Sequence, residues 1–210
     1  ESEADEFLSL AEQKTNRRLL KDERTSPVAS GALRWMALAR EQFALSTDIG
    51  VRDWPPDVFW RLRGRANWNL PADWSLQFDQ RLYYFHQQGW GESSRVTFVR
   101  WLPGDLRFAA SSELRWEHDE RNFELSQIVG VGRVLSSRMT VSPRLGLLGN
   151  SRPNWQSSEY FTDITWRYRL HKDWLYAELI PALTFPREDD FKENPSITFR
   201  IEMLFFGRED

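Results

Sequence analysis

The chain has 210 residues, which suits one domain, and a formal net charge of -3, so its overall charge gives no reason to expect nucleic acid as a partner. It contains 11 Trp and no Cys, yet its mean hydropathy is -0.61, so a polar average coexists with many aromatic rings. No stretch approaches the roughly 20 consecutive apolar residues of a transmembrane helix, and a helix that crosses a bilayer is not expected.

Residues 1–42 differ from the rest and are predicted to form a partly helical N-terminal extension. Apolar residues between Asp5 and Lys21 have partly helical spacing, and a second short helix is predicted from Gly31 to Gln42. The first residues include no initiator Met, which suggests a mature form after signal-peptide removal. Two interpretations stay open: a frayed leader, or a basic amphipathic element on a membrane surface or in a barrel mouth.

From Phe43 onward the hydrophobic period changes to two. Between Trp74 and Tyr84, for example, apolar and polar side chains alternate at every second residue, which is typical of a strand with two different faces. The same pattern predicts about ten strands, several of them ten residues or longer, as a tilted membrane crossing requires. They span residues 43–52, 58–69, 74–86, 94–101, 106–118, 123–135, 139–149, 158–171, 174–185 and 196–206.

Two kinds of connector interleave along the chain. One set is tight, at residues 70–73, 102–105, 136–138 and 172–173. The other set is longer or richer in polar residues and Pro, at residues 53–57, 87–93, 119–122, 150–157 and 186–195. Membrane barrels have tight periplasmic turns and longer extracellular loops. With an even strand number, both chain ends are then predicted to be periplasmic, with a barrel from residue 43 to 206 and a short tail at 207–210.

The period alone does not say which face points inward, and a soluble barrel or sandwich is the alternative. Aromatic residues near the strand ends favour the membrane arrangement, in which rings form girdles at the two interfaces. The polar face is rich in Arg, which pairs bidentately with carboxylates in a confined lumen. The predicted interface aromatics are Trp60, Trp68, Trp74, Trp101, Trp116, Trp166, Trp174 and Phe205.

On these features the sequence resembles the outer-membrane β-barrel class of Gram-negative bacteria over residues 43–206. The resemblance is carried by a terminal amphipathic strand that closes on an aromatic residue, with Ile197, Phe199, Ile201, Met203 and Phe205 on one face. It implies a closed antiparallel transmembrane barrel in the outer membrane, in contact with lipid and lipopolysaccharide and recognised by the barrel assembly machinery. The tail Gly207–Asp210 departs from the class, which usually ends on the aromatic itself.

The polar face is predicted to line the lumen with a charge network. Its members are Asp48, Arg61, Arg63, Arg65, Asp79, Arg81, Arg107, Glu113, Arg115, Glu117, Arg144, Asp163, Arg167, Arg169, Glu178, Arg200 and Glu202. If these charges neutralise one another, the barrel is filled and acts as a structural, anchoring or partner-docking protein. If the row Arg61, Arg63 and Arg65 is not cancelled, the lumen is a narrow anion-selective passage, porin-like in kind. The facing of Arg95, Arg100 and Arg133 stays open.

Catalytic chemistry has little support in the sequence. The three His are His86, His118 and His171, and no Gly-rich phosphate loop, zinc motif or calcium loop accompanies them. The position of His118 beside Asp119 and Glu120 is similar to that used by omptin-type outer-membrane proteases, so a hydrolase at the outer mouth is a remote alternative. No catalytic residue, cofactor or metal is predicted.

A periplasmic protein partner is the remaining expectation. The first helix is basic toward its end, with Lys14, Arg17, Arg18, Lys21 and Arg24. These side chains suit an acidic partner or an anionic lipid surface.

Overall fold

A computed structural model describes residues 31–40, 42–52, 57–172 and 174–203. These residues form strands and turns, with one 3₁₀ turn, and none belongs to a helix long or apolar enough to cross a membrane. The elements are β1 (Gly31–Ala39), β2 (Phe43–Arg52), β3 (Asp57–Leu70), β4 (Trp74–Phe85), β5 (Gly89–Leu102), β6 (Leu106–Glu117), β7 (Asn122–Ser136), β8 (Met139–Asn150), β9 (Gln156–His171), β10 (Leu175–Pro186), η2 (Arg187–Asp189) and β11 (Asn194–Met203).

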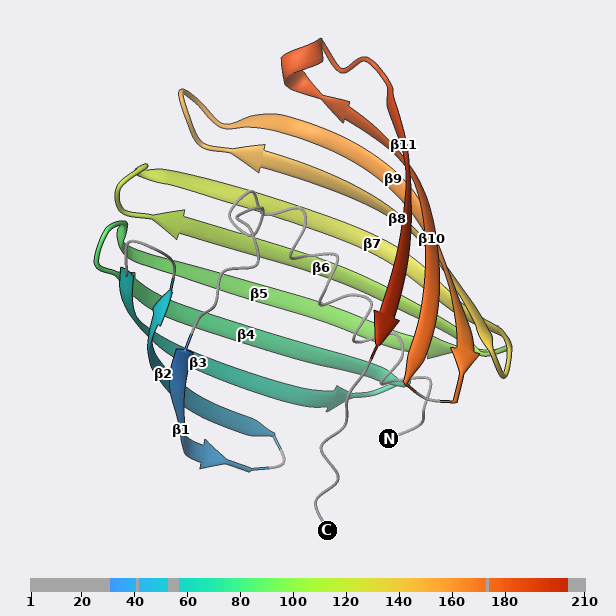
Figure 1. The fold of residues 1–210 in the computed structure, drawn as a ribbon, viewed down its shortest axis with the longest axis horizontal. Coiled ribbons are helices and arrows are strands. Elements are labelled where there is room, and N and C mark those ends of the chain that lie inside the picture. Colours follow the sequence, from blue (N-terminus) through green and yellow to red (C-terminus); the bar gives the residue numbers. More distant parts are fainter. Residues whose placement is uncertain (1–30, 41, 53–56, 173, 204–210) are drawn as a thin grey trace.

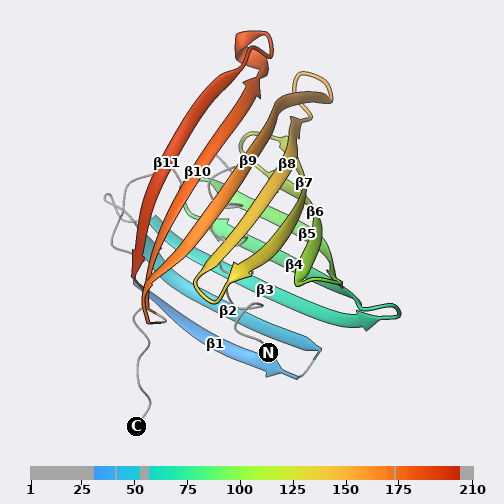
Figure 2. The same ribbon diagram turned by 90° about the vertical axis from the view of Figure 1, so that its right-hand side faces the viewer.

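The eleven strands form one antiparallel sheet in which each strand pairs with its neighbours in sequence, from β1 through β11. The sheet is strongly curled, as the two perpendicular views show (Figure 1, Figure 2). The all-β prediction is confirmed, and each of the ten predicted strands overlaps one of β2 to β11. No hydrogen-bonded pairing between β1 and β11 occurs among the described residues, so closure stays a prediction.

The prediction of a short helix from Gly31 to Gln42 is wrong. Residues Gly31–Ala39 form strand β1, which pairs with β2 from Gly31 opposite Val51 to Ala39 opposite Ala44. Ala, Leu and Met favour a helix locally, but pairing with a neighbouring strand overrides this weak preference. The sheet therefore begins before Phe43. The helix predicted between Asp5 and Lys21, the aromatic Phe205 and the tail lie outside the described residues.

Short and long connectors separate onto the two ends of the sheet. The β3–β4 and β5–β6 turns are tight and use left-handed backbone, for example at Ala72 (φ 62°) and Gly104 (φ 81°). We call their end the short-turn end and the opposite one the loop end. The connector predicted at residues 87–93 is wrong in length, because β5 starts at Gly89.

Because the number of described strands is odd, the first strand starts and the last strand finishes at opposite ends of the sheet. Strand β1 starts at the loop end, whereas β11 finishes at the short-turn end. The even count that placed both chain ends on one side therefore does not hold for the described strands.

The two faces of the sheet differ in chemistry and in burial. One face carries buried charged residues such as Asp48, Arg144 and Glu178, and we call it the inner face. The other carries large exposed apolar residues such as Leu145 (64% exposed) and Ile197 (76%), and we call it the outer face. A soluble sheet normally buries its apolar face. This one does the opposite, which is the arrangement of a strand surrounded by lipid.

Candidate functional site

The strand register brings every residue of the predicted charge network to the inner face. These are Asp48 on β2; Arg61, Arg63 and Arg65 on β3; Asp79 and Arg81 on β4; Arg107, Glu113, Arg115 and Glu117 on β6; Arg144 on β8; Asp163, Arg167 and Arg169 on β9; Glu178 on β10; and Arg200 and Glu202 on β11. The pairing and burial of these side chains bear on whether the lumen is open to ions or filled.

The most buried part of the network joins β9, β10 and β11, and we call Arg167, Glu178, Arg200 and Glu202 the β9–β11 cluster. Arg167 Nη1 lies 2.8 Å from Glu178 Oε1 and 2.9 Å from Glu202 Oε2, while Arg200 Nη1 lies 2.9 Å from Glu178 Oε2. Arg167 also lies over the Tyr176 ring, 4.3 Å from its centroid. The carboxylates and guanidiniums alternate, so the cluster holds three strands together in a place that water barely reaches.

Two further groups of ion pairs line the inner face. Arg144 forms a bidentate pair with Asp163, with Nε–Oδ1 and Nη2–Oδ2 distances of 2.9 and 2.6 Å. Arg95 donates from Nε to Glu113 Oε2 at 2.8 Å. Both side chains of this pair are mostly buried, with Arg95 13% and Glu113 6% exposed.

A mixed network spans β4 and β6 near the loop end. The Tyr83 hydroxyl accepts a bond from Arg115 Nε at 3.2 Å and donates to Glu117 Oε1 at 3.3 Å, and Arg115 also pairs with Glu117. The three side chains cross over β5, where Gly91 lies opposite Tyr83. A Cβ at Gly91 would lie 2.3 Å from the Tyr83 ring, so only glycine lets the ring lie flat on the sheet.

On the inner face of β3 and β4, arginines outnumber carboxylates. We call Arg61, Arg63, Arg65 and Arg81 the arginine wall. Arg61 pairs with Asp48 at 3.3 Å and Arg65 with Asp79 at 3.0 Å.

Arg63 and Arg81 lie directly opposite each other, and their other cross-strand neighbours are Ser46 and Ser93. Neither one has a carboxylate directly opposite it, but the Asp79 and Glu113 carboxylates lie near enough to interact with Arg81. Two guanidiniums face to face across a strand pair repel each other, and nearby carboxylates reduce that repulsion.

The ion pairs of the inner face also differ in how exposed their two side chains are. In the two ion pairs of the arginine wall the arginine is the accessible member: the side chain of Arg61 is 31% exposed against 2% for Asp48, and that of Arg65 is 46% exposed against 14% for Asp79. In the β9–β11 cluster Arg167 and Glu178 are both 2% exposed, while Arg200 is 22% exposed beside Glu178. The accessible charge on the β3–β4 wall is therefore positive, and the arginines there are more accessible than Arg200 in the β9–β11 cluster.

The register also settles positions that the sequence pattern left open. Arg95 lies on the inner face, opposite Asp79 and Glu113, whereas Arg100 and Arg133 lie on the outer face. The Arg100 guanidinium lies 5.4 Å from the centroid of the Trp74 ring, beside the short-turn end. A signal for Arg95 was present in the sequence, because Ser93 and Thr97, two positions before and after it, are polar.

Most predicted interface aromatics lie on the outer face, and one does not. Trp60, Trp68, Trp74, Trp116 and Trp166 share the face of the exposed apolar residues, and Trp60 packs edge-on against Trp90 at 5.9 Å. Trp174 lies in the turn before β10 and packs edge-on against His171 at 5.6 Å. Trp101 lies opposite the buried Arg107 and therefore faces inward, so its assignment to the interface is wrong. The prediction assumed that apolar residues of β5 share one face, but near the end of this strand they occupy both faces.

The sequence analysis missed two aromatic side chains on the inner face, Phe59 and Phe85. Phe59 is 4% exposed and its ring lies 5.7 Å from that of Phe85, which in turn lies 5.6 Å from that of Tyr83. These rings lie at the loop-end side of the arginine wall, and the Arg61 guanidinium lies 5.3 Å from the Phe59 centroid. The alternation concealed them, because each occupies a position reserved for polar residues.

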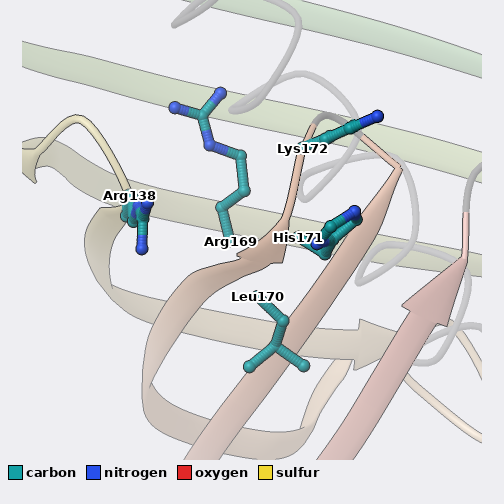
Figure 3. A pocket seen from close by; sticks show the side chains of 5 residues that line it. All are labelled: Arg138, Arg169, Leu170, His171 and Lys172. Atoms are coloured by element: carbon teal, nitrogen blue, oxygen red, sulfur yellow. The ribbon is translucent and has the colours of Figure 1, made fainter.

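A hollow of about 460 Å³ lies at the short-turn end, lined by Arg138, Arg169, Leu170, His171 and Lys172. Arg169 and Leu170 point to opposite sides of β9 (Figure 3). The three His residues of the chain are all exposed, and the described residues contain no group of three or more acidic or His side chains that could hold a metal ion.

Comparison with solved structures shows the fold class. The chain is similar to the NanC porin, with a TM-score of 0.53 and 10% sequence identity over 85% of this chain and 94% of that one. It is also similar to the siderophore receptor PirA from Pseudomonas aeruginosa, with a TM-score of 0.50 and 12% identity over 84% of this chain and 38% of that one. No protein-family model and no curated protein matches the sequence. At these identities the likeness concerns the fold, which is the porin-like fold of outer-membrane β-barrel proteins.

Proposed function

We propose that the chain is a bacterial outer-membrane barrel with a narrow passage for small anionic solutes. The observation that supports this proposal best is the excess of arginine on one part of the inner face: in the Arg61–Asp48 and Arg65–Asp79 pairs the accessible side chain is the arginine, and Arg63 faces Arg81. Rings of fixed cationic side chains favour anions in a pore. The NanC neighbour is named a porin, which supports a passage in a barrel of this size.

The proposed membrane location is supported by the apolar outer face of the sheet. The exposed residues of β11, such as Phe199 (65%) and Ile201 (55%), would be costly in water but suit lipid. Closure of the sheet into a barrel would also remove its two free strand edges, which a bilayer does not tolerate. In this arrangement the tight turns face the periplasm and the longer loops face the exterior.

A second function has an observation in its favour. The β9–β11 cluster and the Arg144–Asp163 pair are buried and neutralised, which suits a barrel that is filled rather than open. Such a barrel would serve as an anchor, with residues 1–30 docking a periplasmic partner through their basic side chains. Deleting residues 1–30 and testing co-purification from membranes examines this alternative.

Conductance in a planar lipid bilayer separates the two. The passage predicts discrete current steps and a reversal potential in a KCl gradient that shows preference for chloride. Replacing both Arg63 and Arg81 with Gln should shift that potential toward cation preference. Arg133→Gln is the matched control, because Arg133 lies on the outer face of the same sheet and should leave selectivity unchanged.

Folded protein that gives no current steps would overturn the passage and favour the filled barrel. Folding is checked independently by the gel-mobility shift that membrane barrels show on heating. Steps with unchanged selectivity in the double variant would instead show that the arginine wall does not line the conducting path.

A further inference from the structure

Two aromatic rings meet on the inner face of β4 near the loop end, and we call Tyr83 and Phe85 the aromatic corner. The Tyr83 ring lies over Gly91 of β5, where a Cβ would come within 2.3 Å of it. The Phe85 ring is inclined at 62° to the Tyr83 ring, with the centroids 5.6 Å apart. Both side chains are half-buried. A ring that lies flat on a sheet turns its other face toward the enclosed space, so the corner offers a stacking surface with an upright neighbour.

The polar groups around the Tyr83 ring are engaged with one another. The Tyr83 hydroxyl donates to Glu117 at 3.3 Å and accepts a bond from Arg115 at 3.2 Å, and Arg115 also pairs with Glu117. These contacts fix the ring in place. A sugar that gave up water from several hydroxyls here would find partners that are already in use, which is costly. An apolar ring needs no such partners, so this surface suits an aromatic ring better than a sugar ring.

The arginine wall begins directly beside the aromatic corner. Arg81 precedes Tyr83 by two residues on the same face of β4, roughly 7 Å away along the strand, and Arg63 lies opposite Arg81 on β3. Arg81 is half-buried, and the two carboxylates that lie near it are already paired with other arginines. Positive charge next to a stacking surface matches a solute that carries a carboxylate on a flat ring.

We infer that the aromatic corner and the arginine wall together bind aromatic carboxylates, with the ring on Tyr83 and the carboxylate at Arg81 and Arg63. This assignment rests on the anion passage proposed above and names its substrate class. Guanidinium groups bind carboxylates through paired hydrogen bonds, which fix orientation as well as charge. Stacking on Tyr83 adds a contact that a carboxylate without a ring cannot make. The site therefore distinguishes solutes of equal charge by their ring.

Isothermal titration calorimetry of the full chain in detergent micelles, corrected by titration of empty micelles, tests the site. Benzoate should bind about fivefold more tightly than acetate or glucuronate, which carry the same charge without an aromatic ring. Tyr83→Leu and Phe85→Leu should each remove most of this preference, whereas Tyr83→Phe keeps the ring and should retain it. Tyr84→Leu is the matched control, because Tyr84 lies on the outer face of the same strand and its loss should leave the preference unchanged.

Equal affinities for benzoate and acetate would overturn the inference, and so would a loss of preference in Tyr84→Leu as large as that in Tyr83→Leu. Glucuronate that binds as tightly as benzoate would overturn the aromatic assignment. In planar bilayers benzoate should also block the chloride current at a lower concentration than acetate does. Anion-selective current without any benzoate preference refutes this inference alone, whereas preferential binding of benzoate without current refutes the passage and supports the binding site.

Discussion

Replacing Glu178 with Gln is expected to destabilise the protein by about 3–5 kcal/mol, the usual cost of breaking a buried ion pair. The Glu178 carboxylate accepts a hydrogen bond from Arg167 at 2.8 Å and forms an ion pair with Arg200 at 2.9 Å, and it is 2% exposed. Each charge-assisted bond is worth about 1.5–3 kcal/mol. A Gln side chain keeps one neutral acceptor but turns an NH₂ group toward a guanidinium that can only donate. The remaining Glu202 cannot compensate two arginines.

Urea unfolding in phospholipid vesicles, followed by Trp fluorescence, measures this change in the free energy of unfolding. Glu188→Gln is the control, because Glu188 is exposed in η2 and a surface change of this kind usually costs under about 0.5 kcal/mol. The reasoning is refuted if Glu178→Gln unfolds within about 1 kcal/mol of the control. That result would mean that water reaches the β9–β11 cluster and screens its charges.

Three other substitutions test the packing and the orientation of the sheet, each by the same unfolding assay. Gly146→Ala places a Cβ 2.0 Å from the Phe161 ring and should cost about 1–3 kcal/mol, with recovery in the double variant Gly146→Ala/Phe161→Leu; no recovery would locate the strain elsewhere. Leu145→Arg, on the outer face in mid-strand, should cost about 2–4 kcal/mol in vesicles, and a neutral result would contradict lipid exposure. Gly104→Ala meets open space but has φ 81°, so it should cost only about 1 kcal/mol, and a larger loss would reveal an unseen contact.

The sequence analysis located the strands well where both faces keep a strict alternation. It failed at β5, where the polar, Gly-containing stretch from Gln87 to Ser93 has the composition of a loop. In the structure Gly91 belongs to a strand, and it is glycine because the Tyr83 ring covers it. That contact joins two strands, and no property of residues 87–93 alone reveals it. The failure at β1 has the same origin, since its strand conformation depends on β2.

The candidate site was predictable in composition but not in pairing. Period-two spacing was enough to place Arg61, Arg63 and Arg65 on one face. Which side chain lies opposite each of them depends on the length of the β3–β4 turn, because a shift of one residue would exchange the two faces. The observed register puts Arg63 opposite Arg81 and Arg65 opposite Asp79. The excess of accessible positive charge is therefore a property of the turn as much as of the strands.

The strict neighbour-to-neighbour order of the sheet has a consequence for how the protein is built. Because every strand from β1 to β11 bonds only to the strands just before and after it, each contact closes a loop of a few tens of residues at most. Short closures are entropically inexpensive and are made quickly. Assembly can thus proceed as the addition of one hairpin after another onto a growing edge, and in the proposed barrel only the final closure of β1 onto β11 joins distant segments.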